Sequence, residues 1–310
     1  MRVAVLDIGT NTFNLIIAES AGGESFRILY NEKLPVKLGE GGINNREILQ
    51  IAFDRGIKAI EEHYTTIQIY KAEKIYAFGT SALRTARNSK DFIDTIKKIT
   101  GIDVEIISGD REAELIYYGV IQTLTMTHEK YLILDIGGGS NEFIIANNQE
   151  IFWKKSYPIG IARLIEKFKP SDPIKPDEII AIEEYFYHQL KDLILLVKKE
   201  KITTLIGASG SFETFVAMIH SSDDDAKTQS ALIPQSIPIS EDDFNTLYEK
   251  LIKSTTAERY RMKGLESMRI EMIVLACLFV KFITRKLEIK TIIQSNFSLK
   301  EGAVYQLLNH

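Results

Sequence analysis

A short glycine-containing pattern occurs twice in this chain, and the two copies align without a gap. The first copy reads VLDIGTNT followed by FNLII over residues 5–17, and the second reads ILDIGGGS followed by NEFII over residues 133–145. In each copy an apolar run ends in an aspartate, Asp7 or Asp135, turns at a glycine and returns as a second apolar run. A gapless internal repeat of this kind predicts a duplicated domain.

The composition of the two turns predicts phosphate binding. Glycine lets a ligand approach the backbone closely, and successive backbone N–H groups in such a turn form a concave anion site. A carboxylate at the end of the strand suits Mg²⁺, which usually bridges one or two carboxylates to substrate phosphates. We therefore expect Asp7 and Asp135 to hold Mg²⁺. The residues expected to bind phosphate are Gly9, Thr10, Asn11 and Thr12 in the first turn and Gly137, Gly138, Gly139 and Ser140 in the second.

Other interpretations of the glycine turns fit less well. An ordinary hairpin, in which the aspartate only stabilises its own turn, would explain one copy but does not call for two gapless ones. A dinucleotide-binding fingerprint needs G-x-G-x-x-G between a strand and a helix, whereas a strand-like run follows both turns here. The pattern G-x-x-x-x-G-K-[ST] of many nucleotide-binding proteins is absent from the sequence.

Length, charge and hydropathy limit the class of protein. A chain of 310 residues predicts about two domains. The net charge of −4 argues against a general nucleic-acid binder, which would show a basic excess. No apolar stretch approaches the ~20 residues that span a bilayer, and the acidic Asp7 comes too early for a signal peptide. We therefore expect a cytoplasmic protein in which Cys277, the sole cysteine, is a buried apolar residue without a disulfide.

The apolar periodicity predicts an α/β fold. Strand-like runs cover residues 3–7, 13–18 and 26–30, and a helix is expected from Asn45 to Tyr64. The theme repeats in the second half, with strands over 131–135, 142–146 and 151–155 and one long helix over 177–200. Helices that alternate with strands, twice over, predict helices on both faces of two sheets.

The repeat suggests two domains with a ligand between them. We place the first domain at residues 1–124 and the second at 125–310, and expect a C-terminal helix over about 298–310 to pack back on the first domain. A crevice between duplicated domains is then the expected binding site. The polar stretch from Ser221 to Ser230 is expected to be the most mobile part of the chain.

Three further stretches carry polar residues at predicted strand-to-helix junctions. The stretch FGTSALRTARN contains Arg84, whose planar guanidinium suits a bidentate phosphate contact. The stretch ISGDREAELI begins a helix that leads into the second repeat. The stretch IGASGS contains a glycine loop, with Gly207, Ser209, Gly210 and Ser211 as candidates for binding a further phosphate or a nucleoside.

Together these stretches resemble the exopolyphosphatase/guanosine pentaphosphatase family, within the actin, sugar-kinase and Hsp70 ATPase superfamily. The matching stretches are DIGTNTFNLII, GTSALRTARN, ISGDREAELIYYGV, ILDIGGGSNEFII, GASGS and SLKEGAV, in the order of the family. The resemblance implies two ribonuclease-H-like domains and Mg²⁺-dependent removal of a terminal phosphate. It implies inorganic polyphosphate or guanosine pentaphosphate as the substrate, and by analogy a homodimer.

The resemblance also implies an acidic catalytic set. The catalytic glutamate of the family falls on Glu112, which would position or deprotonate the attacking water and which we expect to be ionised in the first turn of its helix. Asp135 and Glu142 match carboxylates that hold metal or water, and the counterpart of Glu142 in the first repeat is Asn14. The alternatives are that Glu112 only complements a helix dipole and that Glu142 faces solvent on an edge strand.

The sequence departs from the family pattern in a few places and leaves other functions open. Glu114 stands where the family usually has a basic residue, and Arg111 stands where it often has an acid. This exchange of charges puts in doubt any phosphate contact from that part of the helix. The chain ends soon after SLKEGAV, so we expect a short form less suited to processive action on long polyphosphate. A non-catalytic phosphonucleotide sensor would not need the acidic set, and an ATP-dependent kinase would need an acceptor motif that we do not find. The preference between polyphosphate and guanosine pentaphosphate is not readable from the sequence.

Overall fold

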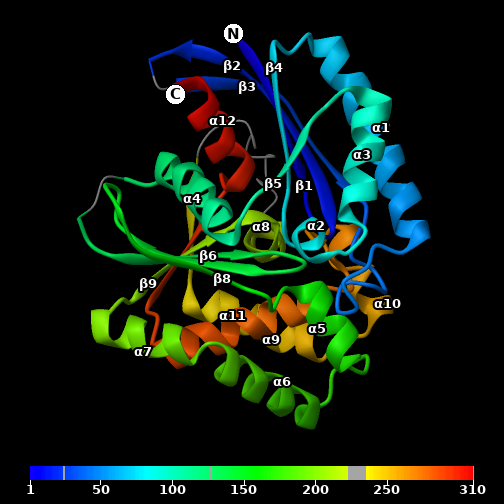
Figure 1. The fold of residues 1–310 in the computed structure, drawn as a ribbon. Coiled ribbons are helices and arrows are strands. Elements are labelled where there is room, and N and C mark those ends of the chain that lie inside the picture. The colour runs from blue at the N-terminus through cyan, green and yellow to red at the C-terminus, as the bar shows by residue number, and fades with distance from the viewer. Residues whose placement is uncertain (24, 126–127, 223–234, 310) are drawn as a thin grey trace.

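Two sheets with related strand orders form the framework of the protein in this computed structural model, which describes residues 1–23, 25–125, 128–222 and 235–309 (Figure 1). The first sheet has the order β3-β2-β1-β4-β5 and the second β10-β11-β9-β6-β7-β8. The first consists of β1 (Arg2–Ile8), β2 (Thr12–Gly22), β3 (Ser25–Pro35), β4 (Lys74–Gly79) and β5 (Val104–Ile106). The second consists of β6 (Tyr131–Ile136), β7 (Asn141–Ala146), β8 (Ile151–Tyr157), β9 (Thr204–Ala208), β10 (Ser236–Ile239) and β11 (Thr291–Ser295).

The two sheets have the same topology apart from one additional edge strand. In each, the first three strands along the chain form an antiparallel meander, and the next strand pairs parallel to the first. The register is equivalent as well, because Asp7 pairs with Asn14 in one sheet and Asp135 with Glu142 in the other. The predicted duplication and the ribonuclease-H-like α/β fold are confirmed.

The helices form layers on both sides of the sheets (Figure 1). The apolar cores assign α1 and α3 to the outer face of the first sheet, and α5, α6, α7, α9 and α11 to the outer face of the second. Their bounds are α1 (Gln50–Tyr70), α2 (Ser81–Thr85), α3 (Ser89–Thr100), α4 (Gly109–Val120), α5 (Ile161–Phe168), α6 (Pro176–Gln189), α7 (Lys191–Glu200), α8 (Ser209–Ile219), α9 (Glu241–Ile252), α10 (Thr256–Arg259), α11 (Ile273–Leu287) and α12 (Leu299–Asn309). Short 3₁₀ turns are η1 (Ile121–Thr123), η2 (His220–Ser222) and η3 (Ser267–Arg269).

Helices α4 and α12 lie between the two sheets and join them. Their buried side chains, such as Ile116 and Val304, share one core with Val5 of the first sheet and Ile133 of the second. The C-terminal helix therefore packs against α4 and the N-terminal strands, although it follows a strand of the second sheet (Figure 1). This placement brings the segment before α12 close to the ends of β1 and β6.

Two predicted helix boundaries were wrong. Helix α1 begins at Gln50 rather than at Asn45, because other bonds hold the residues before it: the N–H of Glu47 donates to Gly42 O, and that of Ile48 to the side-chain oxygen of Asn88. The start of this segment bonds to the first glycine turn, where the N–H of Lys37 donates to Asn11 O and that of Gly39 to Thr10 O. The predicted helix over 177–200 is broken at Leu190, so that α6 and α7 both bury apolar side chains in one core. Most of the polar stretch 221–230 lies outside the described residues.

Two further expectations from the sequence concern the burial of Cys277 and membrane-spanning segments. Cys277 is fully buried in α11, and burial raises the pKa of its thiol, as expected for an apolar core position. Within the described ranges of the chain, no helix is long and apolar enough to cross a bilayer.

His63 of α1 is fully buried directly behind the first glycine turn. Its Nε2 lies 3.3 Å from the carbonyl oxygen of Phe13, and its Nδ1 lies 3.5 Å from the carboxylate of Glu32. Burial lowers the pKa of His63, and this effect outweighs the opposing effects of the Phe13 carbonyl and of Glu32. The unfolded chain, in which histidine has a pKa of about 6.5, therefore binds a proton more readily than the native state.

We expect this histidine to make the protein less stable in mild acid. Above about pH 6.5 the ring is neutral in both the native and the unfolded state, so His63 does not reduce the free energy of unfolding. This free energy falls as the pH decreases from there toward the lower native pKa of His63. A His63→Gln variant should lose less of its melting temperature than the wild type between pH 7 and pH 5, as thermal unfolding can measure. Parallel decreases in the two proteins would assign the acid sensitivity to other groups.

Candidate active site

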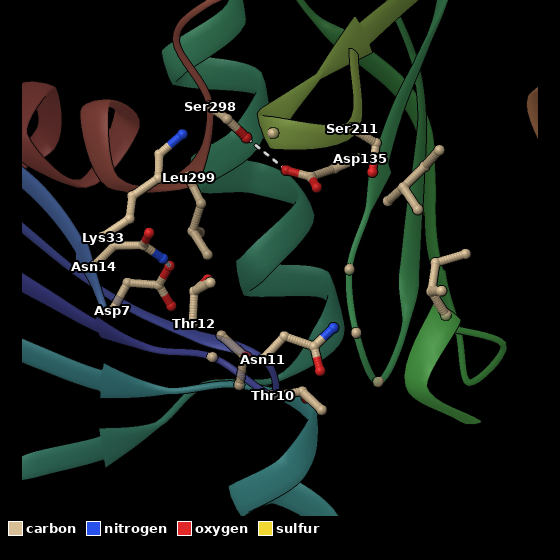
Figure 2. Close-up of a pocket in the computed structure, with 18 of the residues that line it drawn as sticks. Asp7, Thr10, Asn11, Thr12, Asn14, Lys33, Asp135, Ser211, Ser298 and Leu299 are labelled. Atoms are coloured by element: carbon tan, nitrogen blue, oxygen red, sulfur yellow. Dashed lines mark hydrogen bonds between the residues drawn. The ribbon is translucent and has the colours of Figure 1, made fainter. Parts of the chain in front are cut away.

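The two glycine turns line the same cavity between the sheets. Figure 2 shows Asp7, Asn14 and Lys33 on the side of the first sheet, and Asp135 and Ser211 on the opposite side. All eight turn residues predicted to bind phosphate line this cavity, together with the four predicted acids Asp7, Glu112, Asp135 and Glu142. The structure thus brings together residues that are more than 100 positions apart in the sequence.

The turns have the same backbone geometry and lie in direct contact. The N–H of Gly9 donates to Thr12 O at 3.1 Å, and the N–H of Gly137 donates to Ser140 O at 3.0 Å. The second turn can approach the first because it lacks side chains. A Cβ at Gly138 would lie 2.5 Å from the Asn11 amide nitrogen. The triple glycine is therefore explained by contact between the turns as well as by space for a ligand.

The four carboxylates are all buried around the cavity. Glu142 is 1% exposed, which excludes the alternative of a solvent-facing glutamate. Burial raises the pKa of Asp7 and of Glu112 to about 7 in each case, against the lowering effects of Asn14 on Asp7 and of Arg84 on Glu112. Burial, with the nearby Glu112 adding to it, also raises the pKa of Glu142. Burial therefore opposes the ionised form of Glu112, which its first-turn position and Arg84 favour.

Such a carboxylate set is compatible with a hard divalent cation. One oxygen of Asp7, Oδ1, is buried and has no hydrogen-bond partner, as expected of an atom that a cation would occupy. Among the described residues, however, no three acids converge closely enough to enclose an ion by themselves. The arrangement fits Mg²⁺, which takes one or two protein carboxylates and completes its shell with waters and substrate phosphate oxygens.

Neighbouring side chains orient each acid. Asn14 donates to Asp7 at 2.8 Å, and Ser156 donates to Glu142 at 2.6 Å. The hydroxyl of Ser298, just before α12, donates to Asp135 at 2.5 Å (Figure 2). The sequence predicted Ser298 only as the start of a helix. Its contact with Asp135 depends on the packing of α12 between the sheets.

Glu112 lies in the first turn of α4, where the Ser108 side chain caps the helix by accepting the N–H of Arg111 at 3.1 Å. Arg84 donates to the Glu112 carboxylate at 3.0 Å and to the carbonyl oxygen of Ile107 at 2.9 Å. Arg84 thus contacts Glu112 in this structure, and its direct contact with phosphate stays a prediction.

The third glycine loop contributes only in part. Gly210 and Ser211 line the cavity. Gly207 instead faces the ring of Phe212, which a Cβ would approach to 2.1 Å, so this glycine serves packing in the second core. Ser209 is the first residue of α8. Sequence reasoning missed several further lining residues, which are Thr80, Ser81, Glu213, Met268, Arg269, Met272, Asn296, Leu299, Lys300 and Glu301.

Arg163 of α5 connects the two sides of the cavity. Its guanidinium donates to the carbonyl oxygen of Gly139 at 2.8 Å, to that of Ile43 at 3.0 Å and to the Thr85 hydroxyl at 3.2 Å. Gly139 belongs to the second turn, whereas Ile43 lies in the segment that bonds to the first turn. The planar fork of arginine allows these three bonds, which the single amine of lysine cannot reproduce.

We expect Arg163→Lys to loosen the segment that supports the first turn. A hydrogen bond to a charged group contributes about 1.5–3 kcal/mol, so the loss of one raises the frequency of local opening at least about tenfold. Hydrogen exchange at the Gly39 amide, which bonds to Thr10 O, should accelerate accordingly. Lys167→Ala, on the same helix against Tyr185, serves as the control and should leave this amide unaffected. Equal exchange in Arg163→Lys and wild type would contradict the role of Arg163.

Comparisons with known proteins identify the family. The sequence profile of the Ppx/GppA phosphatase family matches residues 16–310. The chain belongs to this family. A solved structure described as an exopolyphosphatase from Cytophaga hutchinsonii is 38% identical, covers 100% of this chain and 98% of its own, and superposes with a TM-score of 0.95.

More distant relatives extend the similarity. Exopolyphosphatase 1 of Mycobacterium leprae is 24% identical over 100% of this chain and 90% of its own length. The solved structure of the Aquifex aeolicus family member has a TM-score of 0.81 at 24% identity, covers 100% of this chain and 99% of its own, and supports the fold. The resemblance proposed from the sequence motifs is therefore confirmed at the level of the family.

Proposed function

We propose that this protein is a Mg²⁺-dependent phosphohydrolase that releases the terminal phosphate of inorganic polyphosphate. The observation that carries the proposal is that Glu112, a buried acid, lines the same cavity as both glycine turns. The Cytophaga hutchinsonii exopolyphosphatase, similar over the whole chain, supports polyphosphate as the substrate class.

In this proposal the backbone N–H groups of the two turns bind the terminal phosphoryl group. Glu112 accepts the proton of the attacking water, and Arg84 orients the Glu112 carboxylate through their hydrogen bond. One or two of the carboxylates of Asp7, Asp135 and Glu142 would hold Mg²⁺, which neutralises charge on the phosphate oxygens when it is bound. Most of the catalytic effect then comes from positioning and charge neutralisation, as is usual in phosphoryl transfer.

Guanosine pentaphosphate is a second proposed substrate, because its terminal phosphate offers the same chemistry. Gly210 and Ser211, on the far side of the cavity from the first turn, would contact the part of the substrate beyond the reacting phosphate. A sensor or a kinase would use the same turns for phosphate. A sensor has no need of a buried acid in this cavity, and a kinase would need an acceptor motif that the sequence does not show.

The experiment that tests the proposal is phosphate release by the purified protein. Long polyphosphate, tripolyphosphate and guanosine pentaphosphate are compared with Mg²⁺ and with EDTA. Release that requires Mg²⁺ supports the hydrolase, and the ranking of the substrates defines the activity. Tight binding in calorimetry without any release would overturn the enzyme in favour of the sensor, and release that requires an alcohol acceptor would indicate the kinase.

A further inference from the structure

Glu213 lies in a part of the cavity that also holds several basic side chains and the acid Glu301. It lies on α8, one turn after the glycine loop, and lines the cavity with Lys33, Arg269 and Lys300. Its carboxylate accepts a hydrogen bond from Lys33 at 2.5 Å. Because Lys33 belongs to β3 and Glu213 to α8, this ion pair joins the two sheets across the cavity.

Glu213 is charged in this environment. Burial alone would raise the pKa of its carboxyl group, but Lys33, Lys300 and Arg269 outweigh burial and lower it. The side chains of Lys33 and Glu213 are 24% and 33% exposed, so a ligand in the cavity can reach both. The two other cations have acidic partners of their own, with Lys300 2.7 Å from Glu301 and Arg269 3.5 Å from Glu266.

The position of the Lys33–Glu213 pair places it beside the inner part of a phosphate chain bound in the cavity. Asp7, Asn14 and Lys33 occupy paired positions on β1, β2 and β3, so Lys33 lies two strand spacings, roughly 10 Å, from the acid beside the reacting phosphate. Figure 2 shows the three side chains in this row along the cavity wall. A polyphosphate that extends from Asp7 toward β3 therefore passes Lys33, whereas a chain too short to reach β3 ends before it.

We propose that Glu213 is a specificity-determining residue that selects short phosphate chains over long polyphosphate. Its negative charge repels the inner phosphates of a long chain, and its hydrogen bond occupies the lysine that would otherwise attract them. The expected changes in turnover rest on the proposed function. The expected changes in binding can be tested without turnover.

The test is the conservative variant Glu213→Gln, which keeps the size and an acceptor for Lys33 but removes the charge. We expect the KM for long polyphosphate to fall about tenfold, with kcat changed less than twofold and with the KM for tripolyphosphate unchanged. The gain should diminish at high salt, because added ions screen charges that remain partly exposed. Glu266→Gln is the matched control. Glu266 pairs with Arg269 but is not among the residues that line the cavity. This variant should leave both KM values within twofold of the wild type.

Calorimetry separates this inference from the proposed function. In a Glu112→Gln background, in which turnover is expected to be too slow to consume the ligand during a titration, Glu213→Gln should bind long polyphosphate about tenfold more tightly and tripolyphosphate equally well. Equal or weaker binding of the long chain, in a variant with an unchanged melting temperature, would overturn the inference and leave Glu213 as a structural partner of Lys33. Absence of turnover by the wild type would overturn the proposed function and leave the binding test valid.

A second variant, Lys33→Met, removes the opposite charge and should weaken binding of the long chain selectively. Equal weakening of both ligands would also contradict the proposal.

Discussion

Replacing Glu112 with glutamine is expected to lower kcat about 10³-fold, within the range that a positioned acid–base group contributes to proton transfer. The amide has the size of the carboxylate, and its oxygen can still accept the hydrogen bond from Arg84, which measures 3.0 Å in the wild type. It cannot accept a proton from water. The KM should change little, because the backbone N–H groups of both turns remain in place.

Glu114→Gln is the control for this variant. Glu114 lies on the same helix and pairs with Arg111 at 3.0 Å and with Lys154 at 3.1 Å, and it is not among the residues that line the cavity. Its kcat should stay within twofold of the wild type. The Glu112→Gln protein should melt at least as high as the wild type, since burial disfavours the charge that it removes. A kcat near the wild-type value in this folded variant would show that another group activates the water.

Gly302→Ala is expected to destabilise the protein by about 3 kcal/mol, the upper range for overpacking. A Cβ at Gly302 of α12 would lie 1.8 Å from the carbonyl oxygen of Leu115 and 2.8 Å from the amide nitrogen of Gly119, both on α4. These are backbone atoms, so relief requires the two helices to separate. Alanine favours a helix over glycine by only about 1 kcal/mol, which does not offset the collision.

Urea unfolding measures this loss, and Gly101→Ala is its control. Gly101 has a φ of +75° with open space around it, so alanine there brings backbone strain of about 1 kcal/mol without a collision. Gly302→Ala should also reduce activity in the fraction that stays folded, because α4 carries Glu112 and the segment before α12 carries Ser298, which donates to Asp135. A stability equal to that of the wild type would mean that α4 and α12 can separate freely.

Much of the fold could be predicted from local patterns. The two glycine repeats implied equivalent turns, and the paired positions of Asp7 with Asn14 and of Asp135 with Glu142 follow from strand alternation across those turns. Periodicity gave most strands and helices, because amphipathic spacing reflects which face is buried. It did not reveal the break at Leu190, since the apolar pattern continues through it and only packing in the core decides where the helix bends.

Those features of the candidate site that depend on residue type were predictable from the sequence. Those that depend on which distant segments of the chain come together were not. The sequence indicated Glu112, Asp135 and Glu142, but it did not indicate that burial raises the pKa of Glu112, because the packing around a helix is not visible along its sequence. Sequence reasoning also missed Glu213, whose neighbours in the sequence do not indicate that Lys33 faces it.

The amino-acid sequence by itself determined the duplication, the class of fold and the set of acids and glycines available for phosphate chemistry, since these depend on short-range geometry and on spacing within each repeat. Tertiary structure alone decided that the two turns touch, that Ser298 reaches Asp135 and that a charged pair crosses the cavity. The physical reason is that burial and the Coulomb interaction depend on distance in space, and α12 returns to the first sheet from the far end of the chain.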